Sequence, residues 1–95
     1  MSTPYKTYTD LLKSRPKLAR HLASREFDFR ESLVAARKAS GLSQADVATR
    51  IGGSQRWVAD FENYRVNISL SELRNYCLAV GIFWNFEIHF EEELS

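Results

Sequence analysis

Residues 44–63 read QADVATRIGGSQRWVADFEN, in which two runs with apolar residues at helical spacing lie on either side of a glycine pair. Ser43 and Ser54 each stand just before one of these runs. Serine is a preferred N-cap because its side chain accepts a hydrogen bond from a backbone N–H of the first helical turn. Gly52 suits a turn because glycine adopts positive φ without steric cost. The stretch therefore predicts two short helices joined by a turn of three or four residues.

A third helix is predicted over residues 69–80. Ser69 and Glu72 have the spacing of a capping box, in which each side chain bonds to the backbone N–H of the other residue. Leucine, cysteine and valine then recur at spacings of three and four until Gly81, which is typical of a helix with one buried face. Cys77 falls on that face, so we expect it in the core.

The residues upstream also show helix signals. Pro16 favours a helix start, and the leucines and alanines after it predict a helix over residues 16–25. Asp28 and Glu31 resemble another capping box, which predicts a helix from there to a stop at Gly41. The alternative is that this helix is continuous with the one before it.

The central stretch resembles the helix-turn-helix of the Cro/C1-type, or XRE, family of DNA-binding proteins. The resemblance extends over residues 33–82 and rests on a small residue at Ala48, the turn at Gly52, the flanking Gly-Leu-Ser-Gln and Phe-Glu-Asn segments, and the apolar residues Val47, Ile51, Val58 and Phe61. It implies a mainly α fold, a lambda-repressor-like helical bundle. Such families usually have glycine where this chain has Tyr64, so we expect the exit of the second helix to differ.

The resemblance also implies that the helix after Ser54 enters the major groove, where its side chains would read the bases. Arg56 can donate two hydrogen bonds to guanine, Gln55 can pair with adenine, Asp60 can accept from cytosine, and Trp57 can touch a thymine methyl group. The alternatives are that Trp57 anchors the core, that Asp60 pairs with Arg56 four residues earlier, and that Gln55 and Arg56 are ordinary surface residues. The residues expected to contact the DNA backbone are Ser43, Gln44, Ser54, Asn63, Arg65 and Asn67.

The C-terminal residues change period. Trp84, Phe86, Ile88 and Phe90 alternate with polar residues, a pattern typical of a half-buried β-strand. We find no second strand in the sequence, and an unpaired strand leaves its backbone groups without partners. We therefore expect two chains to pair these strands antiparallel in a homodimer through those four residues. The alternative is that the strand packs as an edge on its own helices.

Composition limits the classes of function. Ninety-five residues with 44% hydrophobic content fit one small globular domain, with little room for a deep catalytic pocket. Residues 1–82 hold all 13 Lys and Arg against eight acids, a net charge of +5, whereas the last four acids lie at positions 87 and 91–93. One cysteine and two distant histidines offer no metal site, and we find no nucleophile with an acid–base partner. We therefore expect that the protein is not an enzyme and that it binds no cofactor and no metal.

The sequence thus predicts an N-terminal helical extension over residues 1–27, a helix-turn-helix domain over residues 28–82, and a dimerisation strand with an acidic tail over residues 83–95. No signal peptide or membrane-spanning stretch is evident, so we expect a cytoplasmic protein with no membrane partner. The predicted function is a homodimeric repressor that binds a palindromic operator in double-stranded DNA and regulates its own gene. A leading helix, an XRE-type body, the segment LRNYCLAVG at residues 73–81 and a terminal strand together resemble HigA-type antitoxins. The alternative that this resemblance implies is an antitoxin that neutralises a protein toxin.

Overall fold

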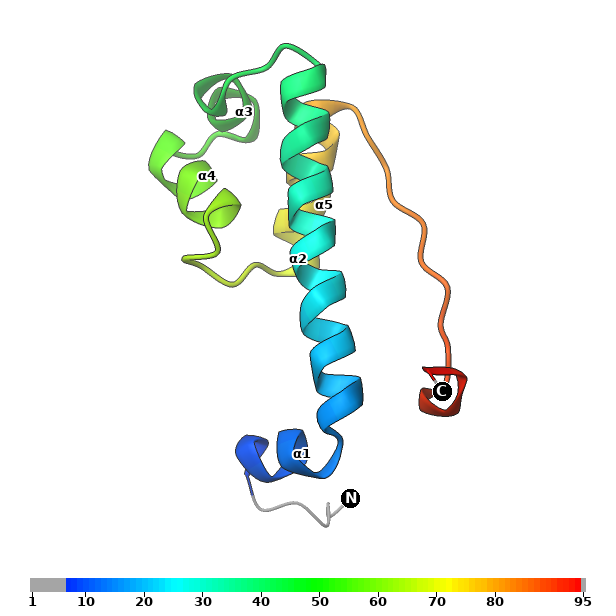
Figure 1. Ribbon diagram of the computed structural model, residues 1–95. Coiled ribbons are helices and arrows are strands. Elements are labelled where there is room, and N and C mark those ends of the chain that lie inside the picture. The colour runs from blue at the N-terminus through cyan, green and yellow to red at the C-terminus, as the bar shows by residue number, and fades with distance from the viewer. Residues whose placement is uncertain (1–6, 95) are drawn as a thin grey trace. The chain divides into compact units, whose positions relative to one another are not determined.

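The computed structural model describes residues 7–94 and contains five α-helices (Figure 1). The chain divides into a unit formed by Phe29–Phe86 and a unit formed by the residues on either side of it. The helices are α1 (Tyr8–Ser14), α2 (Pro16–Ala39), α3 (Gln44–Ile51), α4 (Gln55–Glu62) and α5 (Leu70–Val80), followed by the short 3-10 helix η1 (Glu91–Leu94). The prediction of a mainly α fold with a helix-turn-helix is therefore confirmed.

Three serine caps set the starts of α3, α4 and α5. Ser43 Oγ accepts from the backbone nitrogen of Asp46 at 3.0 Å, and the Asp46 carboxylate accepts from the Ser43 nitrogen at 2.9 Å. Ser69 and Glu72 form the same reciprocal pair at the start of α5. Ser54 Oγ accepts from the Trp57 nitrogen at 3.0 Å. Each cap satisfies backbone N–H groups that a helix start leaves unpaired, which explains why these boundaries could be predicted.

The prediction of a separate helix start at Asp28 is wrong and the alternative of one continuous helix is confirmed, because α2 continues without a break from Pro16 to Ala39. Between these two residues the chain has neither glycine nor proline, so nothing in the backbone interrupts the helix. Asp28 and Glu31 lie inside it. The helix ends before Gly41, which has the positive φ of 72° expected of a helix stop. In the predicted N-terminal extension, α1 and the first half of α2 are helical, while residues 1–6 lie outside the described part.

The core lies where the second half of α2 meets α3, α4 and α5. Val47, Val58, Phe61 and Tyr76 are almost fully buried, and Ala48 brings α3 close to its neighbours. Burying an aliphatic or aromatic side chain of this size stabilises the fold by about 1.5 to 3 kcal/mol. The other buried apolar residues are Leu33, Leu73, Cys77, Ala79 and Val80. Burial raises the pKa of the Cys77 thiol, so this core cysteine stays protonated, as its place on the apolar face predicts.

The predicted C-terminal strand is not formed among residues 7–94. Residues 82–90, orange to red in Figure 1, are extended but make no ladder, because a strand needs a partner that the described residues do not supply. Trp84 is half-buried, and its ring lies 6.4 Å from that of Phe29, centre to centre; the Phe86 ring lies 5.6 Å from Phe29. At Trp84 and Phe86 the segment therefore packs on the chain's own helix α2, which agrees with the alternative to pairing with a second chain. Ile88 remains 91% exposed.

Candidate nucleic-acid interface

Helices α3 and α4 form the helix-turn-helix, joined by Gly52, Gly53 and Ser54. Gly52 takes a positive φ of 69° at the end of α3, which reverses the chain toward α4. The buried face of α4 carries Val58 and Phe61. Gln55 and Arg56 are exposed, and the Arg56 side chain retains 86% of its accessible surface. The outer face of α4 therefore presents a guanidinium and an amide, the two groups predicted to read guanine and adenine.

Trp57 does not share this degree of exposure. It is half-buried, and its ring stacks on Phe61 with the ring centres 5.7 Å apart and the planes 16° from parallel. Most of its aromatic surface thus serves to hold α4, as expected of a core anchor. A contact between the remaining ring edge and DNA stays a prediction.

Asp60 lies between two arginines. Its Oδ2 is 3.7 Å from Arg56 Nε, one helical turn earlier, and its Oδ1 is 3.9 Å from Arg65 Nη1 in the following loop. The backbone nitrogen of Arg65 also donates to the Asp60 carbonyl oxygen at 2.8 Å. The contact with Arg56 corresponds to the alternative in which Asp60 pairs with the residue four positions earlier. The contact with Arg65 was not indicated by the sequence pattern.

Most residues predicted to contact the DNA backbone already have partners within the chain. Ser43 and Ser54 use their hydroxyl oxygens as N-caps, and Asn63 Nδ2 donates to the Ala59 carbonyl oxygen at 2.9 Å. Gln44 Nε2 donates to Glu62 at 3.0 Å. Arg65 and Asn67 lie exposed in the loop after α4. The helix starts therefore offer backbone N–H groups, and the loop offers two exposed side chains, of which Arg65 also lies 3.9 Å from Asp60, as candidate phosphate donors.

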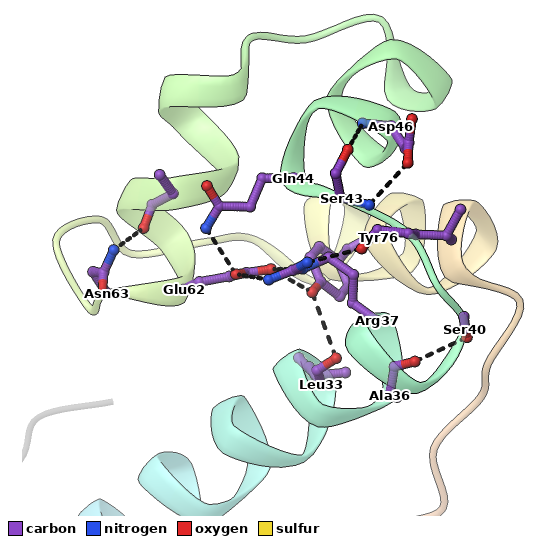
Figure 2. Close-up of polar contacts among 12 residues, drawn as sticks. Leu33, Ala36, Arg37, Ser40, Ser43, Gln44, Asp46, Glu62, Asn63 and Tyr76 are labelled. Atoms are coloured by element: carbon purple, nitrogen blue, oxygen red, sulfur yellow. Dashed lines mark hydrogen bonds and ion pairs between the residues drawn. The ribbon is translucent and has the colours of Figure 1, made fainter.

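The buried carboxylate of Glu62, in α4, is hydrogen-bonded to residues of α2, α3 and α5 (Figure 2). Arg37 of α2 donates from Nε to Glu62 Oε2 at 2.7 Å and from Nη2 to Oε1 at 2.8 Å. Tyr76 of α5 donates its hydroxyl to Oε2 at 2.7 Å, and Gln44 of α3 donates to Oε1. Arg37 Nη1 donates further to the Leu42 carbonyl oxygen at 2.8 Å. Both glutamate oxygens are thus fully satisfied, and α4 is tied to α2, α3 and α5 through one residue.

The ionisation of this cluster follows from its geometry. Burial alone would raise the pKa of Glu62, but the hydrogen bonds that its carboxylate accepts, that from Arg37 first among them, hold this pKa below its ordinary value. The same bond from the other side raises the pKa of Arg37. Burial, followed by the bond to Glu62, raises the pKa of Tyr76. Arginine and glutamate are therefore charged, and tyrosine is neutral, over the whole physiological range.

A second buried arginine fixes the exit of α4. Arg30 Nη1 donates to the carbonyl oxygens of Phe61 at 3.0 Å and Val66 at 3.2 Å. Its guanidinium also lies 5.2 Å from the centre of the Phe61 ring and 5.0 Å from that of Tyr64. Tyr64 has a positive φ of 62°, so it adopts here the backbone conformation that favours glycine. The Tyr64 hydroxyl donates to Glu31 Oε1 at 2.8 Å, which ties the loop to α2.

Sequence reasoning missed these buried charges because arginine and glutamate are normally exposed. One signal was available: Arg30 and Arg37 stand three residues before and four residues after Leu33, on the same strip of α2 that the core buries. A charged residue on an apolar strip indicates a buried partner.

Other candidate sites are weak in the described part of the chain. A shallow hollow of about 350 Å³ is lined by Arg50, Ile51, Asn75, Leu78 and Ala79. Arg50 Nη1 donates there to the Ala79 carbonyl oxygen at 2.7 Å. Among residues 7–94, no three His, Cys, Asp or Glu side chains gather as metal ligands would. None of the helices described combines the length and apolar character needed to cross a membrane.

Comparison with known families agrees with this geometry. A family of helix-turn-helix domains matches residues 28–82, more than half of the chain. The chain belongs to the helix-turn-helix family. It is therefore a helix-turn-helix DNA-binding protein, whose second helix, α4, has the place of the recognition helix. No curated protein and no solved structure matches it. The family match does not separate the XRE group from other helix-turn-helix domains, so that narrower resemblance stays a prediction.

Proposed function

We propose that this helix-turn-helix protein is a sequence-specific transcriptional repressor that binds double-stranded DNA as a homodimer. The observation that supports this proposal best is the outer face of α4, where Gln55 and Arg56 are exposed on a helix whose other face is anchored in the core. Arg56 would donate to guanine and Gln55 would pair with adenine in the major groove. The proposal involves no catalysis, and its setting is the cytoplasm. The resemblance to XRE proteins favours an operator upstream of the protein's own gene.

Phosphate contacts would come from two places. The backbone N–H groups at the starts of α3 and α4, beside Ser43, Gln44 and Ser54, suit phosphate oxygens because helix N-termini attract anions. Arg65 and Asn67 in the loop after α4, with Asn63 at its start, would contact the backbone of the same half-site. These contacts position the protein without reading sequence.

The second copy would be held by residues 84–90. Phe86, Ile88 and Phe90 are exposed, and the backbone of this extended segment makes no ladder in the single chain. Antiparallel pairing with the same segment of a second copy would satisfy the backbone and cover these side chains together with Trp84. Two α4 helices could then occupy successive major grooves about 34 Å apart, which requires a palindromic operator.

The central test is fluorescence anisotropy with the intergenic DNA upstream of the gene and a scrambled duplex, each over a salt series. We expect tighter binding to the upstream DNA. Arg56→Ala should weaken that binding by about 1 to 3 kcal/mol and relax the choice of one base pair, whereas Arg65→Ala should weaken binding to both duplexes alike and lower the salt slope by about one. Equal affinity for both duplexes at physiological salt would overturn the proposal.

Dimerisation is tested by analytical sedimentation of a Phe86→Glu, Ile88→Glu variant. We expect monomers with weaker operator binding, because two charges would be placed in the paired apolar face. The control is Phe83→Glu, since Phe83 is 84% exposed, between Phe86 at 62% and Ile88 at 91%, but lies on the other side of the alternation. A dimer that persists in the double variant would show that another surface pairs the chains.

The second candidate function is an antitoxin that binds and neutralises a protein toxin. The observation that favours it is the exposed apolar segment with the acidic residues Glu91, Glu92 and Glu93 after it, outside the residues that match the helix-turn-helix family. Its test is co-expression with the product of the adjacent gene. If this chain is an antitoxin, it should relieve the growth arrest caused by that product. Arg56→Ala should relieve the arrest as well, because Arg56 belongs to the proposed DNA contact. An adjacent gene whose product does not arrest growth would exclude this candidate.

A further inference from the structure

Asp60 is the one acidic residue of α4 outside the buried core, since Glu62 is buried. Its carboxylate is less exposed to solvent than the two arginines beside it. The Asp60 side chain is 21% exposed, against 86% for Arg56 and 72% for Arg65. Its two oxygens face different arginines, Oδ2 toward Arg56 and Oδ1 toward Arg65. The carboxylate is thus the least exposed of the three charged groups.

Neither helix stability nor DNA affinity explains an acid at this position. Asp60 stands in the last turn of α4, where the helix dipole disfavours a negative charge. An acid near DNA also repels phosphate. An ion pair with exposed arginines contributes little to folding. The remaining effect of the carboxylate is on where the arginines point.

The ion pair with Asp60 is made by Arg56 Nε, 3.7 Å from Oδ2, on a side chain that is 86% exposed, so the terminal nitrogens, Nη1 and Nη2, are the groups that would meet a guanine. Bidentate recognition of guanine needs two parallel N–H groups for O6 and N7. Because the guanidinium is planar and rigid, a contact at Nε restricts the directions in which the terminal pair can point. A side chain oriented before binding also loses less freedom when the complex forms.

We propose that Asp60 is a positioning residue that orients Arg56 toward a guanine and does not itself read a base. Through Arg65 it also ties the loop after α4 to the end of the recognition helix, with the Arg65 backbone bond to the Asp60 carbonyl oxygen as a second tie. The inference rests on the proposed function, since it assigns a specificity role within the same DNA contact.

The test measures discrimination at one base rather than affinity alone. Duplexes are selected from a pool with a randomised centre by the wild-type protein, and each guanine in the selected sequence is then replaced in turn by 7-deazaguanine, which lacks the N7 acceptor. The wild type should lose about 5- to 150-fold in affinity at one position. Arg56→Ala should abolish that loss, which identifies the guanine contacted by Arg56.

We expect Asp60→Asn to lower this discrimination ratio by about fivefold, the equivalent of about 1 kcal/mol. The variant should also bind random duplex more tightly, because a negative charge near the phosphates is removed. Asp60→Glu, which keeps a carboxylate at the same position of the helix, should retain most of the ratio. Unfolding temperatures of all three proteins should agree, since the ion pairs are exposed on the arginine side.

Each other outcome overturns the proposal in a distinct way. If Asp60→Asn raises affinity for every duplex and leaves the ratio unchanged, the carboxylate is only a repulsive charge. If it changes the preference at a cytosine instead, Asp60 reads that base itself. If the wild-type protein selects no sequence from the pool, the proposed function fails, and this is seen before any variant is measured.

Discussion

Replacing Glu62 by leucine should remove a large part of the stability of this protein. The change leaves the guanidinium of Arg37 buried without a counter-charge and leaves the Tyr76 hydroxyl without its 2.7 Å acceptor. Breaking a buried ion pair from one side costs about 3 to 5 kcal/mol. A domain of this size has a free energy of unfolding of about 5 to 15 kcal/mol. The variant should therefore be partly unfolded at moderate temperature.

The matched control is the double variant Arg37→Met, Glu62→Leu. It removes both charges together, so no buried ion is stranded, and apolar replacements of buried pairs are often close to neutral. We expect it to lose about 2 kcal/mol or less, mainly from the bonds to Tyr76 and to the Leu42 carbonyl oxygen. Urea unfolding followed by far-UV circular dichroism measures both variants. A single variant that loses under about 1 kcal/mol, or a double variant that is the less stable of the two, would refute this reasoning.

Three further predictions concern the same unit. Because the pKa of Glu62 is lower in the folded protein, the ionised carboxylate stabilises the fold fully above its ordinary pKa of 4.5, and this stabilisation is lost as the pH falls further. In acid unfolding, the free energy of unfolding of Glu62→Gln should therefore depend less steeply on pH than that of the wild type. Tyr64→Gly should be more stable than Tyr64→Ala by about 1 kcal/mol in thermal unfolding, since both lose the ring but only alanine keeps the strained positive φ; equal stabilities would contradict this. Gly52→Ala should lower the free energy of unfolding by about 1 to 2 kcal/mol because of its positive φ, although an added Cβ would meet no atom within 4 Å. Gly53→Ala, at a residue without positive φ, should lower it little, and urea unfolding midpoints compare the two variants.

The parts of the fold that the sequence predicted correctly are those controlled by local chemistry. Ser43, Ser54 and Ser69 lie directly before the helices that they cap, so each helix start depends on residues within one turn. The outward position of Gln55 and Arg56 was implied by the family resemblance, and their exposure agrees with it because the apolar residues of α4 face inward. The same resemblance turned Trp57 outward, whereas Trp57 is half-buried.

The parts that were missed depend on residues far apart in the chain or on another molecule. Asp28 and Glu31 have the spacing of a capping box, yet they fit equally well inside a helix, and only the absence of a breaker decides between the two. The alternation after Trp84 describes a strand only if another strand lies beside it. The bonds between Arg37 and Glu62 join residues 25 positions apart, a distance at which a single sequence carries no pairing information.

The carboxylate of Glu62 has a consequence for how this recognition surface can change over evolution. A helix that slips by one residue turns by about 100° about its axis. Any such slip of α4 would rotate Glu62 away from Arg37 and leave both charges buried and unpaired. The rotational phase of α4 is therefore discrete, and the positions that face outward cannot drift gradually around the helix. New binding specificities can arise by exchanging the side chains at these positions, while the positions themselves stay the same.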